Sequence, residues 1–392
     1  MTEKLYHRDP YLQEATSGVI RSEERDGRWA VRLERTVFCP EGGGQPADAG
    51  TINGQPLLAL ESDGDDVVHV LGRDPGGGQA RLQLDFARRY DHMQQHTAQH
   101  LLSQVLVRDF NAATLSFAIG PEHSSIEVGR PAFSAEEIRA LEAECARLAF
   151  AALPVRVFET RDPSSLRLRK PPKVQGTIRV VEIDGFDQSA CGGTHVKNSA
   201  ELGLLKIVRT ERVRANIRLY YAAGYRALRD HQLKHELAQR LQRLVTQPLD
   251  AIPLQVEALL KERDELRRER MKSRRRVMEH EIAGAVAEAG PLVVREFSDC
   301  EPADLRFFAS TLMAAGKHVL ACQRSQAAHV VIGRGHGDFD LRSVSARLFA
   351  LLDGRGGGSA NLLEGRADDL ARFGEVVELL RACLLDPAGP RA

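Results

Sequence analysis

The chain contains 392 residues, enough for two or three domains that each bury a core. Lys and Arg number 54, as do Asp and Glu, so the chain has no net charge to attract nucleic acid. Any RNA binding must therefore come from local basic patches. No apolar run reaches the roughly 18 residues that span a bilayer, and the N-terminus has no signal-peptide core. We expect a cytoplasmic protein with no membrane contact, in which six scattered cysteines form no disulfide framework.

The first 85 residues contain short apolar runs separated by turn dipeptides such as Asn53-Gly54 and Asp26-Gly27. The runs have the length of strands and lie at 18–20, 29–33 and 67–71. This pattern predicts a small β-barrel at residues 1–85.

Residues 86–224 predict an α+β domain. Phe86 to Phe110 lacks Gly and Pro and has apolar spacing typical of one long helix. Ser134 and Glu137 form a capping-box pattern that begins a second helix, which runs to about residue 152. Strands are expected to form one antiparallel sheet from 154–159, 178–183, 204–209 and 217–222.

The remaining chain divides into two parts. Residues 225–285 are rich in Leu, Glu, Arg and Lys and are interrupted by Pro248 and Pro253, which predicts a helical hairpin. Residues 286–392 alternate between strand-like and helical segments and predict a separate α/β domain. The fold class as a whole is therefore α+β.

Two ligand pairs predict a metal site. His96 and His100 are four residues apart in the long helix and project from one face. Position 97 is Thr, so the metalloprotease pattern His-Glu-x-x-His is absent. Cys191 and His195 form a second pair, with two glycines between them. Three imidazoles and a thiolate suit Zn²⁺. Two alternatives stay open: the pairs do not meet in space, or four protein ligands close the site and make the zinc structural.

These motifs carry a family resemblance. His96-Thr97-Ala98-Gln99-His100 and Cys191-Gly192-Gly193-Thr194-His195 resemble the editing-domain signature of alanyl-tRNA synthetases and of the free-standing AlaX proteins. The stretch 36–50, with Gly42-Gly43-Gly44-Gln45, resembles the glycine-rich motif of that family. Residues 353–358, with Glu364-Gly365, resemble the DHHA1 domain of the long AlaX form. In a synthetase an aminoacylation domain precedes the editing region, which here begins at residue 1, so we expect no tRNA charging.

The resemblance implies a trans-editing hydrolase that deacylates mischarged tRNA(Ala), chiefly Ser-tRNA(Ala), with Gly-tRNA(Ala) as a second substrate. Editing is the general remedy where binding cannot separate two similar amino acids. By motif match, Thr36, Gln45 and Thr97 are candidates to bind the serine hydroxyl, although each is equally well explained as an ordinary strand, turn or helix residue. If Cys191 is loosely held, it could yield its coordination position during catalysis.

Local charge predicts the RNA surface. Residues 261–276 hold nine Lys or Arg against four Asp or Glu, although a solvated helix face explains such a run as well. The candidate RNA contacts are Arg169, Lys170, Lys173, Arg214, Arg218, Gly356, Gly357 and Gly358. A homodimer through the helical hairpin or the C-terminal domain is a further expectation. Two other functions stay open: a zinc-stabilised RNA-binding protein without hydrolysis, and editing of another seryl-tRNA such as Ser-tRNA(Thr).

Overall fold

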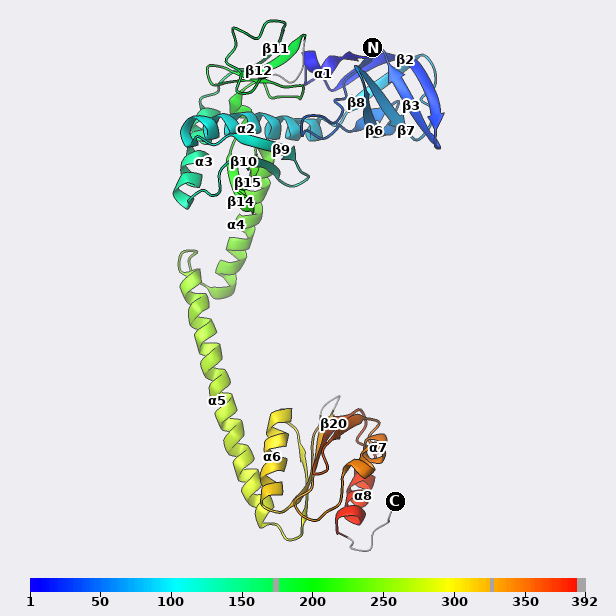
Figure 1. Cartoon of the computed structure of the whole chain (residues 1–392), viewed down its shortest axis with the longest axis vertical. Helices are drawn as coiled ribbons and strands as arrows, with labels where there is room; N and C mark the ends of the chain where they lie inside the picture. Colours follow the sequence, from blue (N-terminus) through cyan, green and yellow to red (C-terminus); the bar gives the residue numbers. More distant parts are fainter. Residues whose placement is uncertain (172–175, 325–327, 386–392) are drawn as a thin grey trace. The chain divides into compact units, whose positions relative to one another are not determined.

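The computed structural model describes residues 1–171, 176–324 and 328–385, and it divides the chain into two compact units, Met1–Leu244 and Val245–Ala392. Helices and sheets occur in both units, which confirms the α+β class (Figure 1). Over the described ranges, no helix combines the length and the apolar character that crossing a bilayer demands.

The N-terminal strands form a closed barrel in the order β2-β3-β7-β6-β5-β8. Turn dipeptides with positive φ join its hairpins: Asp26-Gly27 (53° and 73°) between β2 and β3, and Asn53-Gly54 (50° and 75°) between β5 and β6, as tight two-residue hairpins require. The interior is apolar and includes the fully buried Leu33, Leu71 and Leu82. The barrel strands are β2 (Glu14–Arg25), β3 (Arg28–Leu33), β5 (Gly50–Ile52), β6 (Gln55–Asp63), β7 (Asp66–Leu71) and β8 (Gln79–Leu84). Outside it, β1 (Glu3–Lys4) pairs in parallel with β4 (Arg35–Thr36).

The long helix α2 (Phe86–Phe110) has the predicted bounds. Asp85 caps its first turn by accepting a hydrogen bond from Arg88 N, and Asn111 ends it in the left-handed conformation. Its middle section is buried even where it is polar, so α2 is the central element of this region. The second predicted helix is α3 (Ala135–Phe150), and both hydrogen bonds of the capping box are present.

The prediction of one sheet in this region was wrong, because its strands belong to two. One holds β11 (Val155–Thr160), β12 (Ile178–Ile183) and β13 (Asp187–Ala190); the other has the order β14-β15-β10-β9. Its members are β14 (Leu205–Val213), β15 (Asn216–Ala223), β10 (Ser124–Val128) and β9 (Thr114–Ile119). The strand β15 pairs with β10, far earlier in the chain, a partnership that local patterns do not reveal. The short 3-10 helix η1 (Ser199–Leu202) precedes β14.

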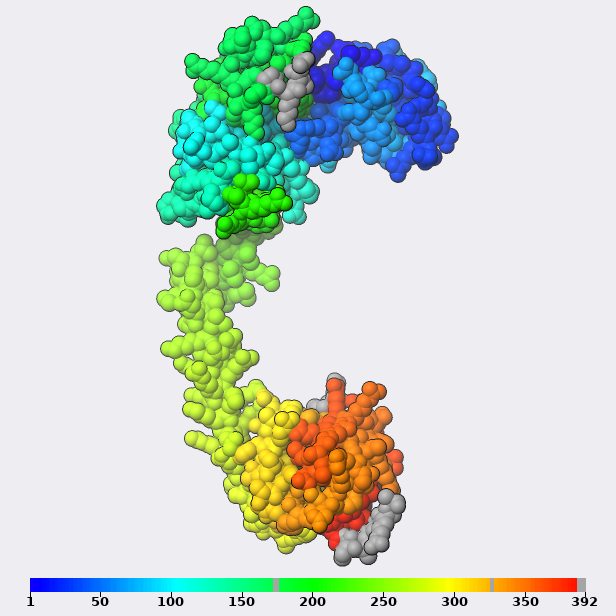
Figure 2. Space-filling model, in the orientation of Figure 1, coloured from blue at the N-terminus to red at the C-terminus, as the bar shows by residue number. Residues whose placement is uncertain are grey.

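A buried ion pair joins the barrel to α2. The Arg89 guanidinium is fully buried and binds the Asp48 carboxylate, the Pro10 carbonyl (2.9 Å) and the Val37 carbonyl (2.7 Å). Asp48 in turn accepts from Cys39 N at 2.6 Å. The glycine-rich loop between β4 and β5 is thereby fixed against the helix that carries His96. Figure 2 shows the barrel (blue) directly beside the cyan and green parts of the same unit.

Residues 225–285 are helical as expected, with α4 (Tyr225–Val245) and α5 (Ile252–Ala287) on either side of a break at Pro248. Their packing as a hairpin stays a prediction. The C-terminal sheet has the order β16-β17-β18-β20-β19, and only β16 and β17 pair in parallel. The other elements of this unit are β16 (Leu292–Phe297), α6 (Pro302–Ala314), β17 (His318–Gln323), β18 (Ala328–Gly333), α7 (Arg342–Leu351), β19 (Arg355–Gly358), β20 (Leu362–Ala367) and α8 (Phe373–Leu385).

Candidate metal centre

The four predicted metal ligands lie together. His96 and His100 come from α2, one turn apart, and Cys191 and His195 come from the loop after β13. Their ligand atoms all lie within 4.8 Å of one another. Cys191 Sγ is 3.4 Å from His96 Nε2 and 3.3 Å from His195 Nε2, near the separation of about 3.5 Å that a tetrahedral zinc would impose. The cluster could therefore hold a metal ion, and its donor set is the one zinc prefers.

The close approach of the two ligand segments depends on glycine. A Cβ atom at Gly193 would lie 2.3 to 2.4 Å from the imidazole of His96 and 2.8 Å from Gln45 Oε1. Any larger residue would therefore force the Cys191–His195 loop away from α2.

Gln45 orients His96. Its Oε1 accepts hydrogen bonds from Thr194 N (3.0 Å) and from His96 Nδ1 (2.8 Å), while its Nε2 donates to Thr194 Oγ1 (2.9 Å). Because His96 Nδ1 is the donor, its Nε2 is free to face Cys191. Gln45 reaches this place through a tight turn at Gly42–Gln45, in which Gly43 and Gly44 have positive φ (57° and 85°).

Asp187 orients His100 as Gln45 orients His96, a role that was not predicted from the sequence. Its Oδ2 accepts from His100 Nδ1 at 3.3 Å and from Ser189 Oγ at 3.0 Å, and Arg169 Nη1 lies 3.5 Å from Oδ1. A carboxylate behind a ligand histidine fixes the tautomer and raises the ligand's basicity. A signal was present, since residues 187, 189 and 191 alternate along a strand and so project to one face.

Thr97 orients the third histidine. Its Oγ1 lies 3.1 Å from His195 Nδ1 and accepts from Val196 N at 3.2 Å. Each metal-facing imidazole thus has one neutral or anionic partner on its far nitrogen, the usual arrangement around a protein-bound metal.

The protonation of two of the four ligands, Cys191 and His195, favours metal binding. Burial would raise the pKa of the Cys191 thiol, but the charges of His96 and His195 and hydrogen bonds from His100 and His195 hold it well below its usual value. Burial lowers the pKa of His195 to about 3, with a further contribution from the charge of His96. A thiolate and a neutral imidazole are the forms that bind metal.

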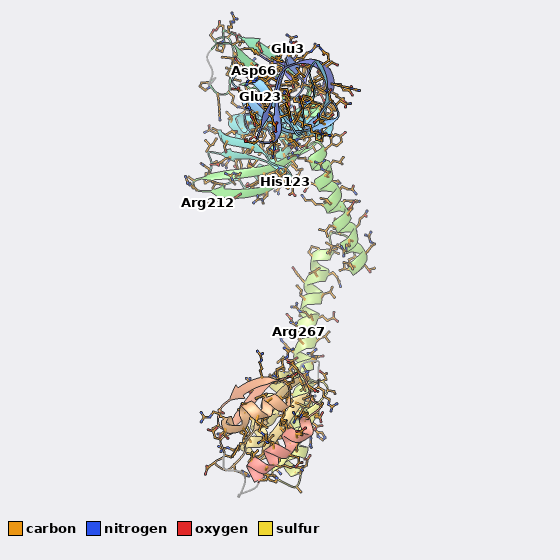
Figure 3. All side chains as sticks on the ribbon, turned by 90° about the vertical axis from the view of Figure 1, so that its right-hand side faces the viewer. Glu3, Glu23, Asp66, His123, Arg212 and Arg267 are labelled. Atoms are coloured by element: carbon orange, nitrogen blue, oxygen red, sulfur yellow. The ribbon has the colours of Figure 1, made fainter. Side chains whose placement is uncertain are left out.

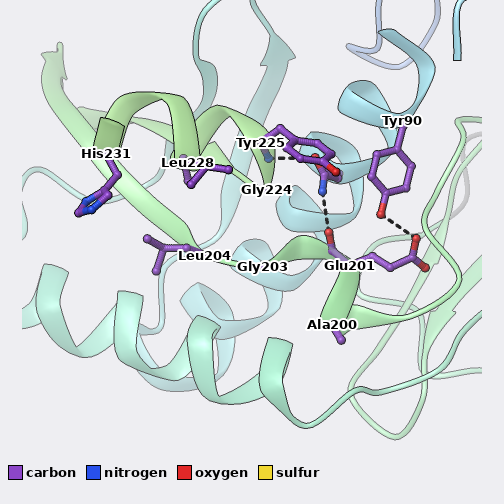
Figure 4. Close-up of a pocket in the computed structure, with 11 residues that line it drawn as sticks. Tyr90, Ala200, Glu201, Gly203, Leu204, Gly224, Tyr225, Leu228 and His231 are labelled. Atoms are coloured by element: carbon purple, nitrogen blue, oxygen red, sulfur yellow. Dashed lines mark hydrogen bonds between the residues drawn. The ribbon is translucent and has the colours of Figure 1, made fainter. Parts of the chain in front are cut away.

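The cluster opens into a cavity of about 610 Å³. Cys191, His96 and His100 line it, together with Tyr6 and His7 from the N-terminal segment and Gly42 and Gly43 from the glycine-rich loop. A second hollow, of about 500 Å³, lies beside the start of α4 (Figure 4). Tyr90, Glu201 and Tyr225 line that hollow, which holds none of the four metal ligands.

The three candidate pocket residues are all buried. Thr36 is buried in the N-terminal region, where its Oγ1 lies 2.8 Å from His69 Nε2 and accepts from Phe38 N. Thr36, Gln45 and Thr97 are absent from the described residues that line the cavity. Their contact with a serine hydroxyl stays a prediction.

The candidate RNA contacts fall in three places. Arg169 and Lys170 line the metal cavity. Arg214 (φ 56°) lies in the turn between β14 and β15, and Arg218 pairs with Glu127 on β10 (3.1 Å); Figure 3 labels Arg212 near the outer end of this hairpin. Lys173 lies outside the described residues.

The three glycines at 356–358 form part of strand β19, which pairs with β20. A Cβ at Gly356 would lie 2.1 Å from the ring of Phe349 on α7, and one at Gly358 would lie 2.1 Å from the Leu362 carbonyl. Packing within the sheet therefore accounts for two of them, whereas Gly357 faces open space.

The class of the protein follows from comparison with known families. The threonyl and alanyl tRNA synthetase second additional domain matches residues 178–220, which include the Cys191–His195 half of the cluster. The alanyl-tRNA editing protein AlaX-L of Pyrococcus horikoshii is 30% identical over 389 residues, covering 94% of this chain and 95% of that protein. The chain belongs to the alanyl-tRNA editing protein family.

Two further proteins are similar. The alanine–tRNA ligase of Pyrococcus abyssi is 27% identical over 96% of this chain and 43% of the ligase. The C-Ala domain of alanyl-tRNA synthetase from Aquifex aeolicus is 28% identical over 24% of this chain and 91% of that domain, with a TM-score of 0.23.

Proposed function

We propose that this protein is a zinc-dependent aminoacyl-tRNA deacylase that hydrolyses the ester of mischarged tRNA(Ala), chiefly Ser-tRNA(Ala), with Gly-tRNA(Ala) as a second substrate. The observation that carries the proposal is the buried cluster of His96, His100, Cys191 and His195 at the wall of a 610 Å³ cavity. Membership of the alanyl-tRNA editing family supplies the tRNA and the reaction.

The residues of the cluster fit zinc. Two of the three histidines have their far nitrogen bound by Gln45 or Asp187, and the third contacts Thr97, so all three Nε2 atoms can serve as ligands. Bound zinc supplies Lewis-acid chemistry, which polarises an ester carbonyl or lowers the pKa of a water molecule. Cys191 lines the cavity with His96 and His100 and is the one of the four ligands that is only partly buried. We propose that Cys191 would be the ligand to give up its place if substrate were to bind the metal.

For the selection of serine we propose a side chain among Thr36, Gln45 and Thr97. Each already has a partner inside the protein, so the one that binds the serine hydroxyl must use a remaining donor or acceptor. Thr97 has one: its oxygen accepts from Val196 N and, with His195 Nδ1 protonated, from that ring too, which leaves its own hydroxyl proton to donate. An unpaired buried donor with alanine bound would protect the correct product.

We propose that the tRNA contacts extend from the cavity to the β14–β15 hairpin and the C-terminal domain. Arg169, Lys170, Arg214 and Arg218 supply cations in the first unit, and Gly356–Gly358 would supply backbone amides in the second. We further propose a homodimer through the helices or the C-terminal domain. Exposed leucines on α4, among them Leu233 (67%) and Leu244 (71%), support a role of this helix in association.

Deacylation of purified Ser-tRNA(Ala), Gly-tRNA(Ala), Ser-tRNA(Thr) and Ala-tRNA(Ala) tests the proposal. We expect Ser-tRNA(Ala) to be hydrolysed fastest and Ala-tRNA(Ala) to be spared. Faster hydrolysis of Ser-tRNA(Thr) would reassign the tRNA. Binding of tRNA without hydrolysis of any ester would support the alternative of a zinc-stabilised RNA-binding protein. We also propose that the chain does not charge tRNA(Ala) with alanine and ATP, and an aminoacylation assay tests this expectation.

A further inference from the structure

An arginine without a full set of partners lies in the wall of the metal cavity. Arg179, on β12, donates through Nη1 to the carbonyls of Cys191 and Gly193, both at 2.8 Å. Its Nε and Nη2 are buried and have no hydrogen-bond partner among the residues that the structure describes. A buried donor without a hydrogen-bond partner destabilises the folded state. The free donors of the guanidinium can therefore bind an acceptor group of a ligand.

The cavity around Arg179 is basic. The described lining residues include four cations, at positions 4, 169, 170 and 179, and one carboxylate, Glu41. Arg169 and Lys170 already bind main-chain carbonyls of His100 and Thr114. Lys4 takes part in no ion pair within the described ranges. Among the residues that the structure describes, neither Arg179 nor Lys4 forms an ion pair with a carboxylate, although Glu159 lies opposite Arg179 on β11.

The chemistry of the substrate supplies an anion at this place. This inference rests on the proposed function, in which the scissile ester is on the ribose of the terminal adenosine of the tRNA. The anionic group nearest to that ester is the 5′-phosphate of the same nucleotide. Arg179 is held by the two carbonyls that flank Gly192, so its distance from the metal ligand Cys191 is fixed by the loop itself. A guanidinium has the planar fork of donors that binds phosphate oxygens in pairs.

We propose that Arg179 binds the 5′-phosphate of the terminal nucleotide of the aminoacyl-RNA, with Lys4 as a second cation. This contact sets the distance between the ester and the metal cluster and makes the enzyme select for a nucleotide rather than a nucleoside. Arg179 then has two roles, since the Nη1 bonds also shape the Cys191–Gly193 loop.

Two ester substrates that differ only in this phosphate distinguish phosphate binding by Arg179 from its role in shaping the Cys191–Gly193 loop. The kcat/KM of the full chain is measured on 3′-O-seryl-adenosine and on its 5′-monophosphate. We expect the wild-type protein to favour the monophosphate on the order of tenfold or more, as for a charge-assisted hydrogen-bond pair. Arg179→Gln should abolish this preference and Arg179→Lys should retain part of it. Loop damage lowers both rates together and cancels in the ratio. Arg156→Gln, on the adjacent strand β11 and paired with Asp184, is the matched control and should keep the preference.

Binding of the unesterified ligands provides the second measurement, because Arg179→Gln could lose all hydrolysis. Calorimetry with AMP and adenosine should show AMP binding more tightly to the wild-type protein, by on the order of tenfold, and equally to Arg179→Gln. Equal binding of both ligands to the wild type, or an undiminished preference in Arg179→Gln, would overturn the inference. If the wild type hydrolyses neither ester but still prefers AMP through Arg179, the proposed function fails and the phosphate site stands.

Discussion

Histidines at helical i,i+4 spacing lie on both α2 and α4, but only His96 and His100 on α2 belong to the candidate metal site. His96 and His100 on α2 have ring centroids 5.3 Å apart, and His231 and His235 on α4 have centroids 6.2 Å apart. The spacing in sequence is identical. The first pair is buried, while the second is exposed to solvent.

The difference lies in what surrounds each pair. The α2 pair meets Cys191 and His195 from a distant loop, and each of its imidazoles has an orienting partner in Gln45 or Asp187. For the α4 pair, the described residues supply Gln239, whose Nε2 lies 2.9 Å from His235 Nε2, and no cysteine or carboxylate ligand cluster. Spacing along a helix therefore brings two imidazoles to one face, but burial and the partners behind them decide whether they form a site.

The largest effect is expected when the histidine pair on α2 is removed. We expect the double variant His96→Ala/His100→Ala to lose its zinc, from about one ion per chain to nearly none, because half of the ligands are gone. Deacylation of Ser-tRNA(Ala) should fall by at least about a hundredfold, since a metal contributes several kcal/mol to the transition state. Elemental analysis and the deacylation assay measure the two effects.

The matched control is His231→Ala/His235→Ala, which removes a pair of the same spacing from an exposed helix face. Its zinc content and its activity should equal those of the wild type. Full zinc occupancy in the α2 double variant, or loss of zinc in the α4 double variant, would show that the metal binds elsewhere.

The sequence predicted those parts of the fold that depend on local pattern. The bounds of α2 and the capping box of α3 follow from helix periodicity and from the Ser134–Glu137 pair, and both are present. The division of the middle region into two sheets was not predictable in this way, because the pairing of β15 with β10 joins segments about ninety residues apart.

The site likewise contains residues that local sequence predicted and residues that it did not. The four ligands could be predicted because they come as two short motifs with fixed spacing. Asp187 and Arg179 act through β12 and β13, and their positions depend on how these strands pair. Thr36 was selected by motif alone; its hydroxyl contacts His69, and its contact with a serine hydroxyl stays a prediction. The role of a residue that acts through a partner can be predicted only from the tertiary structure, because the local sequence does not show which residue that partner is.

An intermediate effect is expected from the carboxylate behind His100. Asp187→Asn keeps the shape of the side chain and removes its charge, so His100 loses basicity and Arg169 loses its anionic neighbour. Zinc affinity should fall by roughly 10- to 100-fold, measured by competition with a chromophoric chelator. Asp184→Asn, an exposed carboxylate at the end of β12 that pairs with Arg156, is the control and should leave the affinity unchanged. Equal affinities in Asp187→Asn and the wild type would mean that Asp187 does not orient a metal ligand.

The smallest effect concerns Thr97, which lies between the two histidines of the α2 pair in sequence and contacts the third ligand, His195. Thr97→Val keeps the branched shape and removes the hydroxyl. If that hydroxyl also donates to the serine of the substrate, the ratio of kcat/KM for Ser-tRNA(Ala) and Ala-tRNA(Ala) should narrow by about tenfold or less, the value of one hydrogen bond. Thr97→Ser restores the hydroxyl and should restore the ratio. An equal decrease for both substrates, with weaker zinc binding, would instead make Thr97 a positioning residue for His195, and the selection of serine would then rest with Gln45, Thr36 or a side chain on the cavity wall.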